Sequence, residues 1–302
     1  MKLTFLGTSA GENYPALWCH CPNCEYARKH GGRNIRQNSC AFIDGDTMID
    51  LSNHAFQTAL QLGIDITAMK VLLMTHDHKD HFYTHHLIWR GMPVTADLQP
   101  AKMGDAFRMD EAIHWMGARM TAVPHLDIYG HETVHQTLLE NDRYHPEQEE
   151  ELYNLTFHAL QPAETIHRPD LGLTFTAVLS NHKKDRSTYN YIIEREGKTL
   201  LYALDCGGYE EDMWKVIAQH QYDCVVLEGT FGLMPDEFPM HQNLNKNLRY
   251  LDFLNANHLW KKEQNFILSH MAPHWTPPYD EYVEIVKPYG IQVAYDGLTI
   301  EF

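Results

Sequence analysis

Short apolar runs alternate with helical patterns along most of the chain. Runs rich in aliphatic, β-branched and aromatic residues predict strands at residues 2–6, 41–43, 47–49, 71–74, 174–179, 189–194, 199–204, 224–227, 266–268 and 291–295. Apolar positions at helical spacing predict helices at residues 52–62 (capped by Ser52), 131–139, 210–219, 243–257 and 280–286. Strands with intervening helices indicate a mixed α/β fold.

Three segments qualify this pattern. Glu196-Gly197-Lys198 predicts a hairpin turn, and the acidic residues 146–151 predict a solvated loop or a helix start. The methionine-rich segment 93–124 fits the alternation poorly, and we interpret it as a helical insertion, a packed helix pair rather than a lid over the substrate. Because the sequence contains no repeat or flexible linker, we expect one domain over residues 1–302.

Composition excludes several classes of protein. With 44% hydrophobic and 21% charged residues, the chain of 302 residues is typical of globular proteins rather than disordered ones. No stretch has the apolar length of a membrane span, and the N-terminus is not typical of a signal peptide, so we expect a cytoplasmic protein that does not bind membranes. The formal net charge of −16, without a dense Lys/Arg run, disfavours a long nucleic acid as partner.

The chain has 21 histidines, and their placement matters more than their number. His76, His78, Asp80 and His81 fall within six residues, directly after the apolar run 71–74. Imidazole suits Zn²⁺ and Fe, and carboxylate extends the choice to Mn²⁺. Such a motif could also be a polar surface turn, but four potential ligands so close together after a buried strand favour a metal site.

The same placement recurs further along the chain. His182, Asp205 and His270 each follow closely on a predicted strand, as His76 does. Any one of them alone would be interpreted as a hydrogen-bonded core or loop residue. If the strands end side by side in the sheets, however, all of these residues come together. Five histidines and two aspartates suffice for two metals with one bridging carboxylate.

Three of the six cysteines form a C-x-C-x-x-C cluster at Cys19, Cys21 and Cys24. In a cytosolic chain such a cluster favours a metal site over a disulfide framework, with three unligated thiols as the alternative. A tetrahedral structural zinc would need a fourth ligand. The remaining, dispersed cysteines are expected to be core residues.

These motifs resemble those of the metallo-β-lactamase superfamily, whose signature is H-x-H-x-D-H followed by a His, an Asp and a final His. The resemblance implies an αββα sandwich with a dinuclear site at the sheet edges. The segments LGTSAG (6–11) and CHCPNCEYAR (19–28) are similar to the phosphoribosyl 1,2-cyclic phosphate phosphodiesterase branch. They also have some similarity to coenzyme PQQ synthesis protein B. The resemblance spans nearly the whole chain, with residues 93–124 as the main excess.

The resemblance also implies the ligand set. Two divalent metals, Zn²⁺ or Mn²⁺, would be held by His76, His78 and His182 on one side, by Asp80, His81 and His270 on the other, and by Asp205 between them. The metals would generate a hydroxide that attacks phosphorus, and they would neutralise the phosphoryl oxygens. Asp80 is counted among the catalytic residues as well as the ligands.

Further roles follow from the same resemblance. The branch completes its zinc site with a histidine shortly after the final catalytic one; here this is His274, one residue later than usual, with His20 as the alternative. His241 matches a general acid of the branch, although it could be a helix-start residue. Asp50 either orients a histidine or is a turn carboxylate.

The function favoured by these residues is hydrolysis of a small cyclic or nucleotide-like phosphodiester. A thioester or lactone hydrolase, an iron redox site and a metal-holding protein of cofactor biosynthesis are the alternatives. A tRNA 3′-processing nuclease is disfavoured by the charge of −16. The sequence leaves the oligomeric state open, with a homodimer among the options.

Overall fold

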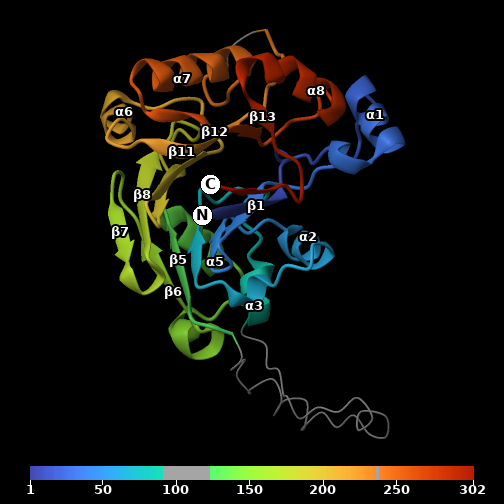
Figure 1. Cartoon of the computed structure of the whole chain (residues 1–302). Helices are drawn as coiled ribbons and strands as arrows, with labels where there is room; N and C mark the ends of the chain where they lie inside the picture. The colour runs from blue at the N-terminus through green and yellow to red at the C-terminus, as the bar shows by residue number, and fades with distance from the viewer. Residues whose placement is uncertain (91–122, 236–237) are drawn as a thin grey trace, which may run out of the picture.

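The computed structural model describes residues 1–90, 123–235 and 238–302, and contains two seven-stranded sheets packed face to face (Figure 1). The first sheet has the order β14-β1-β2-β3-β4-β5-β6. Its strands are β1 Lys2–Gly7, β2 Cys40–Ile43, β3 Thr47–Ile49, β4 Val71–Leu73, β5 Leu126–Gly130, β6 Leu155–Ala159 and β14 Thr299–Glu301.

The second sheet has the order β13-β12-β11-β10-β9-β8-β7. Its strands are β7 Thr165–Arg168, β8 Leu173–Leu179, β9 Tyr189–Arg195, β10 Lys198–Ala203, β11 Tyr222–Glu228, β12 Trp260–Ser269 and β13 Gln292–Val293. The turn between β9 and β10 has positive φ at both Glu196 (53°) and Gly197 (72°), the backbone of a type I′ hairpin turn, which confirms the predicted hairpin.

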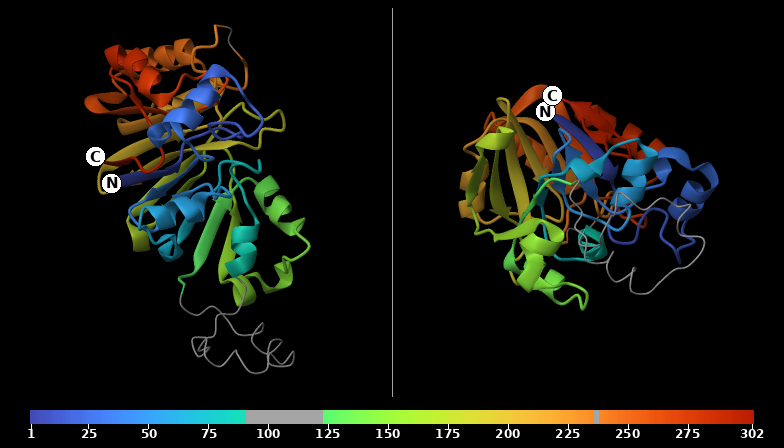
Figure 2. Two further views of the ribbon diagram at one scale, coloured as in Figure 1. Left: turned by 90° about the vertical axis from the view of Figure 1, so that its right-hand side faces the viewer. Right: turned by 90° about the horizontal axis from the view of Figure 1, so that it is seen from below.

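Helices cover the outer faces of the two sheets (Figures 1 and 2). The described α-helices are α1 Pro22–His30, α2 Ala55–Gln61, α3 His85–Arg90, α5 Glu132–Leu139, α6 Glu211–Ile217, α7 Leu244–Ala256 and α8 Tyr279–Val286. Helices α2, α3 and α5 pack on the first sheet, and α6, α7 and α8 pack on the second. These four layers are the αββα sandwich expected from the sequence. Among the described residues, no helix is both long enough and apolar enough to span a membrane.

Alternation of side chains along the strands builds two apolar layers. Leu3 and Phe5 of β1 point between the sheets, into a core shared with the second sheet and its helices. Phe42 and Met48, on the opposite face of the first sheet, pack against its outer helices. Both faces of the central strands are therefore buried, which explains why those strands are continuous apolar runs in the sequence.

Several boundaries differ from the sequence prediction. The helix predicted from residue 52 begins at Ala55, with His54 rather than Ser52 at its N-cap, so the predicted cap is wrong. Of the two alternatives predicted for the acidic residues 146–151, the helix start is correct, because a 3₁₀ turn and a π-helical turn form over residues 146–153. The predicted insertion at 93–124 lies, apart from its last two residues, outside the described residues.

Candidate metal centre and active site

Polar side chains gather at one edge of the sandwich, where strands of both sheets end. Asp50 follows β3 and residues 76–81 follow β4, while His182, Asp205 and His270 follow β8, β10 and β12 closely. These strands run parallel to others of their own sheet, so that their carboxyl ends meet at one edge. The fold thus brings together the seven ligands predicted from the sequence.

Overlapping groups of potential metal ligands form there, and three of them are drawn from the predicted ligands, each with ligand atoms within 4.8 Å of one another. These three groups are His76 with His78 and His182, His76 with His81 and Asp205, and Asp80 with His81 and His270. His78 is exposed and Asp80 is partly exposed, whereas the other five side chains are buried. The cluster is therefore open to solvent on the side of His78 and Asp80.

Asp205 lies between the two sides of this cluster. Its Oδ2 is 2.7 Å from His81 Nε2 and 3.2 Å from His270 Nε2, and its Oδ1 is 3.7 Å from His182 Nδ1. Its Oδ2 also lies 3.9 Å from His76 Nε2, so that this carboxylate faces ligands of both sides. This is the position that a bridging carboxylate requires.

The donor set fits divalent metal ions. The buried atom His76 Nε2 has no hydrogen-bond partner within the described part of the chain. Buried polar atoms are almost always hydrogen-bonded, so such atoms need another partner. Imidazole nitrogens with carboxylate oxygens are the ligands of Zn²⁺ and related cations.

Burial and neighbouring charges set the protonation of these groups. Burial, and then the charge of His81, hold the pKa of His76 well below its ordinary value, so that this ring is neutral, as a metal ligand must be. Burial would also lower the pKa of His270, but the Asp205 carboxylate overcomes this effect and raises it to about 10. The Asp205 carboxylate thus stabilises a positive charge next to it, which the protonated ring carries here and which a metal ion would carry in its place.

The backbone turns sharply at three of these positions. Asp50, Asp205 and His270 adopt positive φ angles of 59°, 49° and 58°. Residues other than glycine rarely adopt this left-handed conformation, and those that do concentrate at functional sites. At the end of a strand, this conformation redirects the chain and leaves the side chain at the sheet edge.

Asp50 holds the ring of His81. Its Oδ2 accepts a hydrogen bond of 2.7 Å from His81 Nδ1, which leaves Nε2 directed at the ligand cluster. Thr75 holds the carboxylate in turn, through its backbone N–H and its hydroxyl. The contact expected if Asp50 orients a histidine is therefore present. A carboxylate bonded to a ligand histidine in this way fixes the orientation and the tautomer of the ring.

His241 stands at the rim of the cluster, with its ring 4.8 Å from that of His182. Its Nδ1 lies 2.9 Å from Glu228 Oε2 and 3.6 Å from Asp205 Oδ1. Burial would lower the pKa of His241, but the Glu228 carboxylate raises it above the ordinary value. Since its side chain is also close enough to His182 and Asp205 to join them as a ligand, geometry allows two roles for His241.

Glu228 is the functional residue that the sequence analysis missed. It is the last residue of β11 and is completely buried, where it accepts hydrogen bonds from the backbone N–H of Cys206 and the hydroxyl of Thr230. Thr230 also contacts His270 Nδ1 at 2.9 Å. The signal was present, since Glu228 is an acidic residue that ends an apolar strand.

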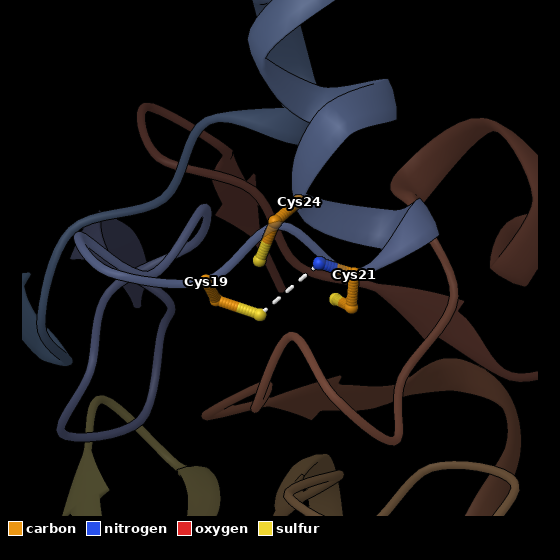
Figure 3. A group of neighbouring side chains, drawn as sticks. All are labelled: Cys19, Cys21 and Cys24. Atoms are coloured by element: carbon orange, nitrogen blue, oxygen red, sulfur yellow. Dashed lines mark hydrogen bonds between the residues drawn. The ribbon is translucent and has the colours of Figure 1, made fainter.

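The three clustered cysteines converge as the second predicted metal site requires. Figure 3 shows the sulfur atoms of Cys19, Cys21 and Cys24 directed toward a common centre, and they lie within 4.8 Å of one another. The backbone N–H of Cys21 donates to Cys19 Sγ at 3.3 Å and lowers the pKa of that thiol to about 7. Such a thiol readily supplies the thiolate that zinc binds. The dispersed Cys40, Cys206 and Cys224 are buried, as expected.

His274, rather than His20, is the histidine placed at the cysteines. His274 Nδ1 is 3.4 Å from Cys19 Sγ, and its Nε2 is hydrogen-bonded to Glu12. His20 instead pairs with Glu25 at 2.7 Å and is largely exposed. A carboxylate on the far nitrogen is the usual arrangement around a metal-binding histidine, which gives Glu12 a role in this site.

Comparison with known proteins places the chain in a family. The sequence matches the beta-lactamase superfamily domain over residues 109–271, more than half of the chain, and the chain therefore belongs to the beta-lactamase superfamily. This confirms the superfamily expected from the metal motif. No curated protein matches the sequence.

Solved structures resemble the fold over its whole length. A diphosphatase of the PhnP family has a TM-score of 0.69 at 20% identity, with 100% of this chain and 97% of that chain covered. Zn²⁺-bound PqqB from Methylobacterium extorquens has 0.69 at 17% identity, with 100% of both chains covered. The short form of human tRNase Z has 0.59 at 15% identity, with 100% and 99% covered. At such identities these similarities establish the fold alone.

Family membership and the His/Asp clusters together support a metal-dependent hydrolase. The chemistry of the substrate has to be argued from the site itself.

Proposed function

We propose that this protein is a phosphodiesterase acting on a small cyclic or nucleotide-like phosphodiester. The observation that carries the proposal is the position of His241, which Glu228 holds at 2.9 Å beside the ligand cluster. A metal centre alone serves many hydrolytic reactions, but a proton donor at its rim serves a poor leaving group such as an alkoxide. A thiolate needs this help much less, which favours a phosphodiester over a thioester.

Two divalent cations, Zn²⁺ or Mn²⁺, fit the residues of the cluster. His76, His78 and His182 would hold one ion, Asp80, His81 and His270 the other, and Asp205 would contact both. Bound there, the cations would lower the pKa of a water molecule and neutralise negative charge on the phosphoryl oxygens.

The remaining tasks fall to residues of the chain. Asp50 keeps His81 in one orientation, and Glu228 fixes the proton of His241 on Nδ1. With Nδ1 occupied, the protonated ring presents Nε2–H to the departing oxygen. The raised pKa of His241, due to Glu228 acting against burial, keeps that second proton available near neutral pH.

Aromatic side chains beside His241 support a nucleotide-like substrate. The ring of Phe231 lies 5.3 Å from that of His241, and Phe238 lies 5.4 Å from Phe231 and is half-exposed. An exposed aromatic surface next to the proton donor suits the stacking of a flat group on the leaving-group side.

Hydrolysis of bis(p-nitrophenyl) phosphate by Zn²⁺- or Mn²⁺-loaded protein tests the proposal. We expect activity in the wild type and none in Asp205→Ala, because loss of the carboxylate between the two ligand groups would separate or release the ions. Asp77→Ala is the matched control. Asp77 lies within the same motif but is paired with Lys183 at 2.5 Å, so this variant should keep its activity.

The same preparations distinguish the runner-up function. Thioester or lactone hydrolysis with no detectable phosphodiester hydrolysis would refute the proposal in favour of an acyl hydrolase on the same metal centre.

A further inference from the structure

A second His/Asp cluster lies on β5 and the edge strand β6 of the first sheet. Asp127, on β5, pairs with Val71, the first residue of the strand that leads to His76. Asp127 Oδ1 is 2.7 Å from His158 Nε2 and 3.8 Å from His125 Nε2. Two imidazole nitrogens thus meet at one carboxylate oxygen, and none of the three residues belongs to the ligand cluster already described.

Hydrogen bonds determine which nitrogen His125 offers. Its Nδ1 is 3.0 Å from Asn154 Oδ1, and Asn154 uses its Nδ2 to donate to the carbonyl of Val123. Oδ1 is therefore the acceptor, so that Nδ1 of His125 carries the hydrogen. Nε2 then has a free lone pair, to which the hydroxyl of Thr156 can donate at 3.2 Å. This neutral tautomer is the form that binds metals.

The other two members are held as well. The ring of His158 stacks on Tyr129, with centroids 4.6 Å apart and planes inclined by 16°. Arg168 of β7 donates to Asp127 Oδ2 at 2.7 Å and is itself paired with Asp170. Since Arg168 occupies Oδ2, the carboxylate presents Oδ1 toward the two histidines.

We propose that His125, Asp127 and His158 form a site for a divalent transition-metal ion such as Zn²⁺. Ligand atoms of a four-coordinate Zn²⁺ lie roughly 3.3 Å apart, given bonds of about 2.0–2.1 Å, and the two measured separations, 2.7 and 3.8 Å, lie on either side of this value. Two histidines and one carboxylate form a donor set that zinc accepts, with water at the remaining position.

Exposure indicates that the site exchanges its ion with solvent. The side chains of His125 and His158 are each 39% exposed, and that of Asp127 is 17% exposed. A bound ion would join β5 to β6, and through Arg168 it would also tie the edge of the first sheet to β7 of the second. We therefore expect the ion to stabilise this open edge of the sandwich.

Equilibrium dialysis against Zn²⁺ tests the site on protein whose catalytic and cysteine sites are already filled. We expect one additional equivalent per chain, measured by elemental analysis, and a rise in Tm with added Zn²⁺. Both effects should disappear in His158→Ala and in His125→Ala. They should persist in His167→Ala, which removes a nearby β7 histidine that contacts only Thr174 among the described side chains.

Phosphodiester hydrolysis by His158→Ala should equal that of the wild type, because His158 contacts none of the residues assigned to catalysis in the described contacts. The proposal is overturned if the wild type takes up no additional equivalent, in which case the cluster is an ion-pair network alone. It is also overturned if His158→Ala and His125→Ala both retain the additional equivalent.

Discussion

Glu228 Oε2 accepts a hydrogen bond of 2.9 Å from His241 Nδ1, and this contact joins the end of β11 to the rim of the candidate active site. The carboxylate cannot turn away, because the backbone N–H of Cys206 and the hydroxyl of Thr230 also donate to it. A buried carboxylate with three donors fixes both the orientation and the tautomer of the ring. The geometry of His241 is therefore set by a residue that does not itself reach the substrate.

Glu228→Gln should shift the pH profile for an alkyl phosphodiester to lower pH. The carboxylate raises the pKa of His241 against the effect of burial, so that loss of its charge lowers this pKa. A general acid must be protonated, and activity is lost as pH rises through its pKa. The measurement is kcat against pH, and the alkaline limb should move toward acid.

The aryl ester bis(p-nitrophenyl) phosphate provides the control for this variant. Its leaving group needs no proton, so its alkaline limb should stay in place. An equal displacement for both substrates would show that Glu228 acts on the metal centre rather than through His241.

Asp50→Asn should weaken the catalytic metal centre while leaving the fold intact. Asp50 accepts the Nδ1 hydrogen of His81, and an amide in its place removes the charge that polarises this ring. Loss of such a partner typically costs about 10–100-fold in metal affinity or activity. Competition with a chelator measures the affinity, and Asp65→Asn, an exposed carboxylate at a helix start, is the matched control. Wild-type affinity in Asp50→Asn would contradict the prediction.

The sequence predicts the ligand cluster well because its members follow closely on buried strands. Apolar runs such as residues 199–204 and 224–227 are unambiguous, and the polar residue after each run is at the sheet edge by necessity. Glu228 follows the same rule, since it comes directly after the run 224–227 and ends β11.

The outer strands are harder to predict. β6 and β7 contain threonine, histidine and arginine at partly exposed positions, so that their apolar alternation is weak. β5 is interrupted by Asp127, whose charge is satisfied by Arg168 from the other sheet. An ion pair of this kind joins residues far apart in the sequence, so the local sequence pattern does not reveal it. The choice between His20 and His274 likewise depended on which loop folds back onto the cysteines.

Cys21→Ser should remove one metal equivalent, the zinc of the cysteine cluster, from the wild-type count. Cys21 supplies one of the three converging sulfur atoms, and a hydroxyl is a poor substitute for a thiolate on zinc. The two catalytic equivalents should remain, because their ligands lie elsewhere. Tm should also fall, because zinc would link the loop of the cysteines to the loop of His274. These two segments already meet at the backbone bridge between Ser9 and Met271.

Cys40→Ser separates metal loss from loss of packing. Cys40 is buried in the core and contacts Ser52, so its replacement affects stability without touching either metal cluster. We expect this variant to keep the wild-type metal count. A full metal count in Cys21→Ser would refute the zinc assignment of the cysteine cluster.

His241→Ala should slow hydrolysis most for substrates with a strongly basic leaving group. The protonated ring, held by Glu228, is placed to give its Nε2 proton to a departing alkoxide. General acids contribute about 10²–10⁴-fold, so turnover of an alkyl or ribose phosphodiester should fall by that factor. The aryl ester should be nearly unaffected, because p-nitrophenolate departs without protonation.

Metal analysis of the same His241→Ala protein decides between the two roles that geometry allows. As a proton donor, His241 can be removed without changing the metal content, whereas a ligand to the ion near His182 and Asp205 cannot. Loss of metal would therefore make His241 a ligand. Equal slowing of the alkyl and aryl esters at full metal content would instead mean that the ring positions the phosphate. Loss of a proton donor slows a strongly basic leaving group far more than a weakly basic one.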